Sequence, residues 1–231
     1  MSMPRLSKSR YCAGLQCLKQ LWWRVHEPSA PELKPGPELQ AVFNRGTDIG
    51  ERARLEFPGG TLIDFQPWRI DEKCDATRAA LAAGAPAIFE ASFFADGVFA
   101  AVDVLERLER GFALVEVKST WSVKPQFLPD VAIQVYVARA AGVDLRRAEV
   151  MHMRRGRRGE PLAFARVDVT EQVEALQAAL SAQVREMRAA MGGELPVVQP
   201  GEQCRRPYDC PFLARCEGAL ADRRLAAPTV A

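Results

Sequence analysis

Asp103, Glu116 and Lys118 are charged residues in an otherwise apolar stretch, and their types suit hydrolysis assisted by a divalent metal ion. Mg²⁺ and Mn²⁺ prefer hard oxygen ligands, which two carboxylates supply. The carbonyl oxygen of Val117 is a candidate third ligand. Lys118 would orient an attacking water or stabilise developing negative charge. Charged groups are costly to bury unless they pair or bind a cation. The stretch therefore predicts a divalent-metal site with an attendant lysine.

A β-hairpin is the element that must position these residues. Two apolar runs, Val98–Leu105 and Phe112–Val117, flank a polar break that contains glycine. This pattern predicts two antiparallel strands joined by a turn with its glycine in the left-handed conformation. Pairing about that turn places Asp103 opposite Glu116 or the residue after it, so two carboxylates from separate strands approach each other.

Two further polar residues belong to apolar segments on either side of the hairpin. Glu90 lies in a preceding strand-like segment and is a candidate third acidic ligand. Gln134 lies in an apolar helix expected from Pro129 to about Ala141, where a buried amide needs hydrogen-bonding partners. The alternative is a surface hairpin whose Glu116–Lys118 pair faces solvent and contributes little. Glu90, Asp103 and Gln134 together favour the metal site over that alternative.

The order of these residues resembles the PD-(D/E)XK nuclease superfamily, and its RecB-type branch most closely: Glu90, Asp103, Glu116-Val117-Lys118, then Gln134. The resemblance implies an α/β (α+β) fold with a restriction-endonuclease-like core, in which helices flank a mixed central sheet. It also implies that Asp103 and Glu116 bind Mg²⁺ or Mn²⁺ and that Lys118 assists hydrolysis. Gln134 would contact DNA or steady the lysine.

The chain departs from the pattern of this branch in two places. Glutamine and tyrosine are usually spaced QxxxY, whereas Ala138 stands at the tyrosine position and Tyr136 follows Gln134 more closely. Tyr136 is nevertheless a candidate DNA contact. A histidine common in an early helix is not apparent, although the segment Gly46–Glu51 fits otherwise. These departures bear on the metal count and the cleavage rate more than on the fold.

Four of the six cysteines form a second candidate site. Cys204, Cys210 and Cys216 are evenly spaced near one end of the chain, and Cys17 or Cys12 near the other end would complete a set of four thiolates. Four thiolates bind Zn²⁺ or an iron–sulfur cluster. Because the spacing is looser than that of a C-x₂-C zinc knuckle, it favours the cluster.

One cysteine before the nuclease core and three after it resemble the iron staple of CRISPR-associated RecB-type exonucleases and AddAB-type repair nucleases. The resemblance implies a [4Fe–4S] cluster held by Cys17, Cys204, Cys210 and Cys216. Cys17, just before Leu18–Trp22, matches the first ligand position better than Cys12. The same resemblance implies protein partners in CRISPR adaptation or DNA repair.

Aromatic and basic residues are candidate nucleic-acid contacts. Trp121, in the loop just after Lys118, is the best candidate for stacking on a base. Arg154 and Arg155 begin a basic turn that extends to Gly159 and would grip phosphates. A solvated hairpin tip explains this turn equally well.

The overall composition sets limits on the class of protein. The 231 residues are 48% hydrophobic and carry 31 Lys and Arg against 29 Asp and Glu, a formal charge of +2. No global basic field indicates nucleic acid, so any such binding must come from local patches. No apolar run approaches membrane-spanning length and no signal-peptide core is apparent, which predicts a cytoplasmic protein without membrane contact.

Local patterns place further helices and strands around the hairpin. The expected helices are Ser7–Val25, Glu38–Phe57, Asp71–Ala83, Pro129–Ala141 and Glu171–Met191, and the expected strands besides the hairpin are Thr61–Phe65, Ala87–Phe94, Glu149–Met153 and Leu162–Asp168. We expect an N-terminal segment carrying the first cluster cysteine (1–37), a nuclease core (38–191), and a linker with the C-terminal cysteines (192–231).

The sequence thus predicts a metal-dependent deoxyribonuclease with a structural iron–sulfur appendage formed by both chain ends. Exonuclease action on single-stranded DNA is implied by the resemblance alone. The alternative is a catalytically weak or inactive PD-(D/E)XK subunit that binds DNA or a protein partner.

Overall fold

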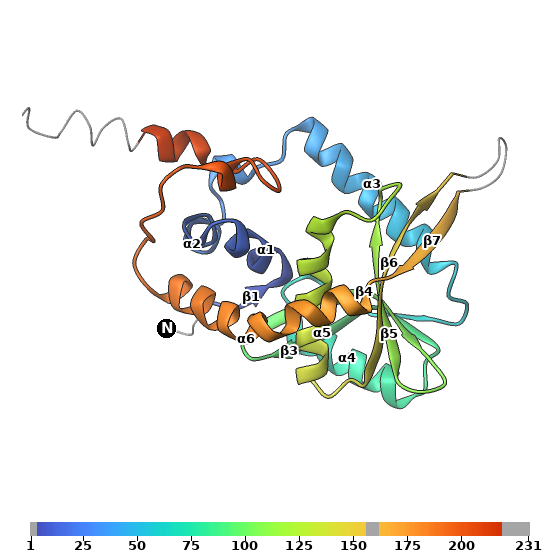
Figure 1. The fold of residues 1–231 in the computed structure, drawn as a ribbon. Helices are drawn as coiled ribbons and strands as arrows, with labels where there is room; N and C mark the ends of the chain where they lie inside the picture. The colour runs from blue at the N-terminus through green and yellow to red at the C-terminus, as the bar shows by residue number, and fades with distance from the viewer. Residues whose placement is uncertain (1–3, 156–161, 219–231) are drawn as a thin grey trace, which may run out of the picture. The chain divides into compact units, whose positions relative to one another are not determined.

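Residues 4–155 and 162–218 are described by the computed structural model, and seven of their strands form one mixed sheet (Figure 1). The chain divides into two units. Among the described residues, the sheet unit contains Arg5–Lys8 and residues 36–182, and the terminal unit contains Ser9–Pro35 and residues 183–218. The predicted α/β class, with a mixed sheet flanked by helices, is confirmed.

The sheet has the strand order β2-β3-β4-β5-β6-β7, and β1 pairs separately with β4. The strands are β1 (Leu6–Ser7), β2 (Thr61–Leu62), β3 (Ala87–Ala95), β4 (Val98–Arg107), β5 (Phe112–Lys118), β6 (Leu145–Arg154) and β7 (Ala163–Asp168). The β2–β3, β5–β6 and β1–β4 pairs are parallel, and the β3–β4, β4–β5 and β6–β7 pairs are antiparallel.

Six α-helices and three short 3₁₀ segments complete the described residues. They are α1 (Lys8–Gln16), α2 (Leu18–His26), η1 (Pro31–Leu33), α3 (Pro37–Arg54), α4 (Ile70–Ala82), η2 (Pro125–Phe127), α5 (Leu128–Ala140), α6 (Thr170–Gly192) and η3 (Glu202–Cys204). None of these helices is long and apolar enough to cross a membrane.

The β4–β5 hairpin forms as predicted. Gly111 has φ +69°, and a Cβ atom there would lie 2.4 Å from the carbonyl oxygen of Asp144. Any larger residue would therefore meet both a strained backbone and a steric clash. The register pairs Val104 with Val115, so the next positions away from the turn, Asp103 and Glu116, stand opposite each other.

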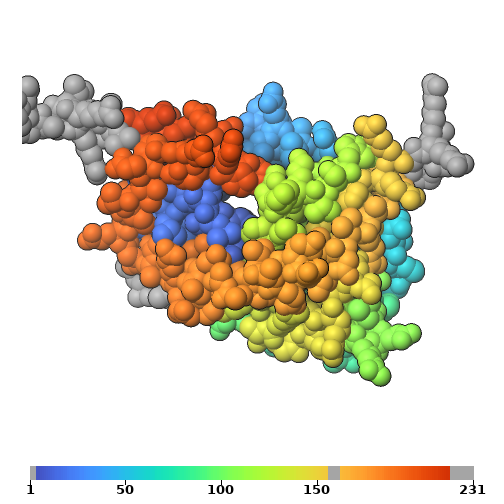
Figure 2. Space-filling model, viewed as in Figure 1, coloured from blue at the N-terminus to red at the C-terminus, as the bar shows by residue number. Residues whose placement is uncertain are grey.

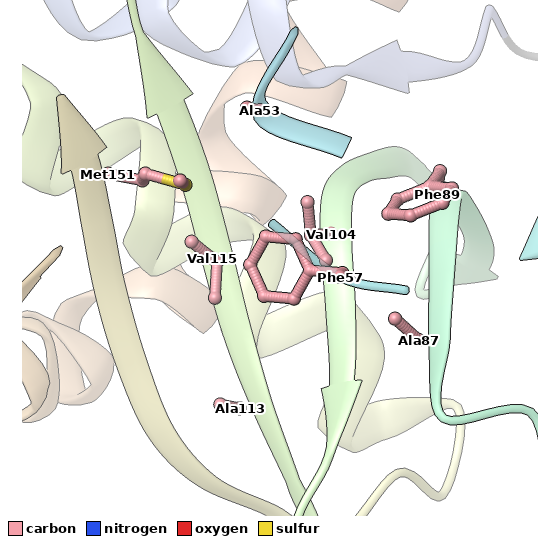
Figure 3. Close-up of a cluster of buried hydrophobic side chains, with 8 residues drawn as sticks. All are labelled: Ala53, Phe57, Ala87, Phe89, Val104, Ala113, Val115 and Met151. Carbon is pink, nitrogen blue, oxygen red and sulfur yellow. The ribbon is translucent and has the colours of Figure 1, made fainter. Parts of the chain in front are cut away.

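Side-chain alternation gives β5 two different faces. On one face the end of α3 and the segment after it cover an apolar cluster (Figure 3): Ala53, Phe57, Ala87, Phe89, Val104, Ala113, Val115 and Met151. Glu116 points to the other face, where it contacts Gln134 of α5. Helix α5 is buried along most of its length, as expected for a helix that is apolar all round. It connects β5 to its parallel neighbour β6.

The first helix differs from its prediction. The expected helix Ser7–Val25 is divided into α1 and α2 at Cys17, whose backbone is extended with φ −167° and ψ 121°. The carbonyl of Cys17 still accepts a hydrogen bond from Leu21 N–H, so Cys17 is the N-cap of α2. An apolar stripe continues across the break, which is why periodicity alone indicates one helix.

The N-terminal part of α3 lies at the surface (light blue in Figure 2). Its side chains Leu39, Val42 and Phe43 are about half exposed, and only Ile49 and Ala53 in the helix are buried. Glu51 is exposed. Helix α3 is therefore attached to the sheet mainly through its C-terminal half.

Candidate active site

The site lies where β4 and β5 separate. Strand β3 pairs with one edge of β4 along its length, whereas β5 pairs with the other edge only as far as Val104 and Val115. Beyond that pair, Asp103 Oδ2 accepts a hydrogen bond from Val117 N–H over 2.7 Å. A side-chain carboxylate thus replaces a backbone acceptor at the point of separation, which holds Asp103 beside Glu116.

Strand β1 pairs with β4 on the same edge as β5, beyond the point where β5 stops pairing. Leu6 pairs with Val98 and Ser7 with Phe99, and Leu6 is completely buried. The next residue, Lys8, therefore enters the site on a fixed backbone. Its Nζ atom lies 3.2 Å from each carboxylate oxygen of Glu116. Lys8 is a site residue that was not predicted from the sequence.

Glu116 is the centre of the hydrogen-bond network. Its side chain is 2% exposed, so the alternative of a solvent-facing Glu116–Lys118 pair is wrong. Besides Lys8, Lys118 Nζ donates to Oε1 over 2.6 Å and Gln134 Nε2 donates to Oε2 over 2.7 Å. Gln134, which was expected to contact DNA or to steady the lysine, therefore donates to the same carboxylate that accepts from Lys118.

Asp130, in the first turn of α5, is a second residue that sequence reasoning missed. Its Oδ2 accepts a hydrogen bond from Lys118 over 2.6 Å, and Lys8 Nζ lies 3.6 Å from its Oδ1. Asp130 precedes Gln134 by four residues, so the two share one face of the helix. That spacing is the signal that could have identified Asp130.

Burial and opposite charges shift the pKa values of this cluster in different directions. Burial, together with the negative charge of Glu116, raises the pKa of Asp103 to about 7. Burial would also raise the pKa of Glu116, but Lys8 and Lys118 outweigh it and hold that pKa well below its usual range. Burial and the negative charge of Glu116 raise the pKa of Asp130. Lys8 and Lys118 act in the opposite direction but do not cancel this increase. Glu116 is therefore the carboxylate that stays ionised.

The charge balance suits an additional cation. When Asp103, Glu116 and Asp130 are all ionised, three negative charges face the two ammonium groups of Lys8 and Lys118. Within residues 4–155 and 162–218, no three His, Cys, Asp or Glu side chains stand ready as a metal site. The oxygens of Glu116 are instead bound by lysine and amide donors. The donor chemistry fits Mg²⁺ or Mn²⁺, provided that one of these donors moves.

Glu90 is not brought into this cluster. Its Oε1 pairs with Arg54 over 3.1 Å, and its side chain is 37% exposed. Glu90 would face Asp103 in the β3–β4 register, but its φ of +56° interrupts the ladder there. Left-handed backbone is strained for a residue other than glycine and often occurs near functional sites. The expectation of Glu90 as a metal ligand thus has no contact to support it.

The candidate DNA contacts are of two kinds, one tyrosine bound to a turn and three exposed side chains. Tyr136 donates to Asp96 in the β3–β4 turn over 2.7 Å, and Ala138 is fully buried. Trp121 is 54% exposed, and the Arg155 guanidinium lies 5.8 Å from its ring centroid. Arg154 is also exposed. The rest of the predicted basic turn, 156–159, lies outside the described residues.

Four cysteines of the terminal unit interact with one another. Burial raises the pKa of the Cys210 thiol, as does negative charge on Cys17, Cys204 and Cys216. Burial likewise raises the pKa of Cys216, with contributions from Cys17 and Cys204. Cys17, rather than Cys12, is therefore the N-terminal cysteine that acts on this group.

Two of these sulfur atoms have a side-chain hydrogen-bond donor beside them. Gln20 Nε2 lies 3.6 Å from Cys210 Sγ, and Lys19 donates to Cys216. Donors of this kind stabilise thiolates that bind metals, so the donor set fits a thiolate-bound metal centre. The four thiols are neighbours but, in the part of the chain that is described, they are not arranged as ligands around one point.

Comparison with known proteins gives distant structural similarities. No family model and no curated protein matches the chain. An alkaline exonuclease (LHK-Exo) from Laribacter hongkongensis aligns over 97% of this chain and 96% of its own, with 14% identity and a TM-score of 0.45. The structure of LHK-Exo in complex with dAMP aligns over 82% of this chain and 91% of its own, with 14% identity and a TM-score of 0.44. The structure of SSO0001 aligns over 94% of this chain and 88% of its own, with 11% identity and a TM-score of 0.43.

Proposed function

We propose that this protein is a metal-dependent deoxyribonuclease of the PD-(D/E)XK type, related to the RecB branch. The observation that carries the proposal is the direct contact of Glu116 with both Lys118 and Gln134, next to Asp103. These are the residues, in the order along the chain, that the sequence resemblance assigns to the nuclease site. They come from β4, β5 and α5 and meet on one face of the sheet.

Asp103, Glu116 and the carbonyl of Val117 would hold Mg²⁺ or Mn²⁺. When bound, such an ion stabilises negative charge on the scissile phosphate and lowers the pKa of a water molecule. Lys118 is held by Glu116 and Asp130 over 2.6 Å each, so its ammonium group has a fixed position from which to orient the attacking water. Gln134 fixes the carboxylate plane of Glu116.

Single-stranded DNA is the substrate that we propose, with cleavage from an end. Trp121 presents an exposed ring three residues beyond Lys118, where a splayed base could stack. Arg154 and Arg155 offer positive charge for phosphates. A base stacked on Trp121 would guide its backbone toward the carboxylates.

We also propose a cytoplasmic location and protein partners from CRISPR adaptation or DNA repair, on the sequence resemblance alone.

We further propose that Cys17, Cys204, Cys210 and Cys216 hold a [4Fe–4S] cluster with a structural role. The mutual electrostatic influence of these thiols and the donors around them support a shared metal centre. A centre bound by both chain ends closes a long loop, which stabilises the folded state. Zinc is the alternative occupant.

A non-catalytic DNA-binding subunit is the second candidate function. Two observations favour it: Lys8 and Lys118 already neutralise Glu116, and Ala138 replaces the tyrosine of QxxxY. A cluster satisfied by internal lysines would hold the fold together without any metal ion.

One assay separates the two functions. Wild type, Glu116→Gln and Lys118→Met are each incubated with end-labelled single-stranded DNA and Mn²⁺, and binding is followed by fluorescence polarisation. Lys124→Met, at an exposed lysine of the same unit, is the matched control. Cleavage by wild type and by the control, lost in the two site variants, supports the nuclease. Intact DNA with all four proteins, together with persistent binding, supports the binding subunit.

A further inference from the structure

Every acceptor position of Glu116 is in use. A carboxylate offers about four lone-pair positions, and Glu116 receives four hydrogen bonds. Oε1 accepts from Lys8 and Lys118, and Oε2 accepts from Lys8 and Gln134. A metal ion that binds this carboxylate at about 2.1 Å must take a position that one of these donors occupies. One donor therefore has to leave.

Lys8 is the donor that is held least tightly. Its two bonds to Glu116 are 3.2 Å long, whereas those of Lys118 and Gln134 are 2.6 and 2.7 Å. Lys118 is also held by Asp130, and Gln134 is completely buried. The side chain of Lys8 is 27% exposed, against 19% for Lys118. The side chain of Lys8 is thus the most exposed of the three donors.

The backbone of Lys8 does not need to move for such an exchange. Residues Leu6 and Ser7 pair with β4, and Lys8 begins α1. Four rotatable bonds separate this anchored backbone from the ammonium group. Asp130 Oδ1, 3.6 Å from Lys8 Nζ, offers a second carboxylate toward which the ammonium group can turn. The charged groups that face Lys8 in the cluster are Asp103, Glu116, Lys118 and Asp130.

We propose that Lys8 is an exchangeable counter-ion of this site: its ammonium group binds Glu116 when no divalent ion is present and leaves when one binds. Like charges repel strongly at such short range, so the ammonium group and the metal ion compete for the same carboxylate. Lys8 stabilises the metal-free protein and weakens its affinity for metal. The proposal rests on the proposed metal site and names a residue outside the sequence motif.

Mn²⁺ binding to the DNA-free protein tests this proposal, by isothermal titration calorimetry or by the loss of the free-ion signal in electron paramagnetic resonance. Lys8→Met removes the competing charge, so its Kd for Mn²⁺ is expected to be about tenfold lower than that of wild type. This change corresponds to about 1.4 kcal/mol of binding free energy. Lys8→Arg keeps the charge and should bind no more tightly than wild type. Lys124→Met removes an equal charge at an exposed lysine and should leave the affinity unchanged.

Thermal denaturation supplies a second readout. Without metal, Lys8→Met should melt below wild type, because Glu116 loses a counter-ion, and saturating Mn²⁺ should reverse that order. If Lys8→Met does not fold, the neutral variant Lys8→Gln replaces it in both measurements. A Kd in the neutral variant that equals or exceeds that of wild type overturns the role of Lys8 and leaves the nuclease proposal standing. Absence of Mn²⁺ binding by every variant overturns both.

Discussion

Gln134 Nε2 donates a 2.7 Å hydrogen bond to Glu116 Oε2, and so joins α5 to the strand that precedes it. The same amide nitrogen lies 3.0 Å from the carbonyl of Asp130, one helical turn earlier. Gln134 is completely buried. Since β5 and β6 are parallel, the crossover helix α5 must pass over the sheet, and this bond fixes its position above Glu116.

Replacing Gln134 by leucine should destabilise the protein by about 1–3 kcal/mol, because a buried charged acceptor loses a donor. The measurement is the free energy of unfolding from urea denaturation. Gln40→Leu is the control, since Gln40 donates to Asn44 on the exposed surface of α3. Equal effects at the two positions would contradict a special role for the buried amide.

Asp130→Asn should slow DNA cleavage by about 10- to 100-fold, the range found for residues that orient a catalytic group. The substitution removes the negative charge that faces Lys118 Nζ over 2.6 Å, so the lysine loses its second anchor. The KM for DNA should stay near that of wild type, because the Asp130 side chain is only 15% exposed and is engaged by Lys8 and Lys118. A large rise in KM with unchanged kcat would instead assign Asp130 to substrate binding.

Asp103→Asn should raise stability and abolish metal binding. The amide can still accept the hydrogen bond from Val117 N–H, but the cost of desolvating a charge at this position and its repulsion from Glu116 both disappear. The pKa of Asp103 is raised to about 7, so its ionised form destabilises the fold. This destabilisation is absent below the pKa of Asp103 in the unfolded chain, near 4. It is fully present above the pKa of Asp103 in the folded protein, about 7.

The gain from Asp103→Asn should therefore be about 1–3 kcal/mol at pH 8 and should shrink toward pH 5, where wild type is protonated. Urea denaturation of metal-free wild type and Asp103→Asn at both pH values measures this gain in the free energy of unfolding. A gain of the same size at pH 5 and pH 8 would show that ionisation of Asp103 is not its cause.

Much of this site could be predicted from the sequence because its central elements are local. The hairpin follows from two apolar runs and Gly111, and the helix around Gln134 follows from its apolar composition and the glycine after it. Lys8 could not be predicted in this way, because 108 residues separate it from Glu116. Its position depends on the two-residue strand β1, which is too short to produce a periodic pattern.

Glu90 shows a different limit. The sequence predicts Glu90 in a strand beside the hairpin, and Glu90 does lie in β3, but its φ of +56° breaks the ladder and its carboxylate pairs with Arg54. Strand periodicity assumes a regular backbone and contains no signal for such a residue. The division of the N-terminal helix at Cys17 has the same origin, since the apolar stripe is insensitive to one extended residue.

Arg215 should hold the C-terminal cysteine segment to the N-terminal helices without any metal ion. Its guanidinium group binds Glu27 and Glu32 over 2.7–3.0 Å and lies about 5 Å from the rings of Trp23 and Phe212. Arg215→Ala removes two ion pairs and two cation–π contacts, worth about 1–2 kcal/mol together. Amide hydrogen exchange in residues 204–216 should become faster, while exchange in β4 and β5 stays unchanged. Arg205→Ala, at an exposed position next to Cys204, should leave both regions as in wild type.

Iron content distinguishes the cysteines of the proposed cluster. Anaerobically purified wild type should be brown, with about four iron atoms per chain. Cys17→Ser should lose iron and the broad visible absorption of the cluster, because Cys17 is the N-terminal thiol that acts on Cys210 and Cys216. Cys74→Ser is the control, since Cys74 lies in α4 of the sheet unit, and it should keep its iron, as should Cys12→Ser. A colourless wild type that contains zinc would contradict the cluster, and iron loss in Cys12→Ser but not in Cys17→Ser would reassign the fourth ligand.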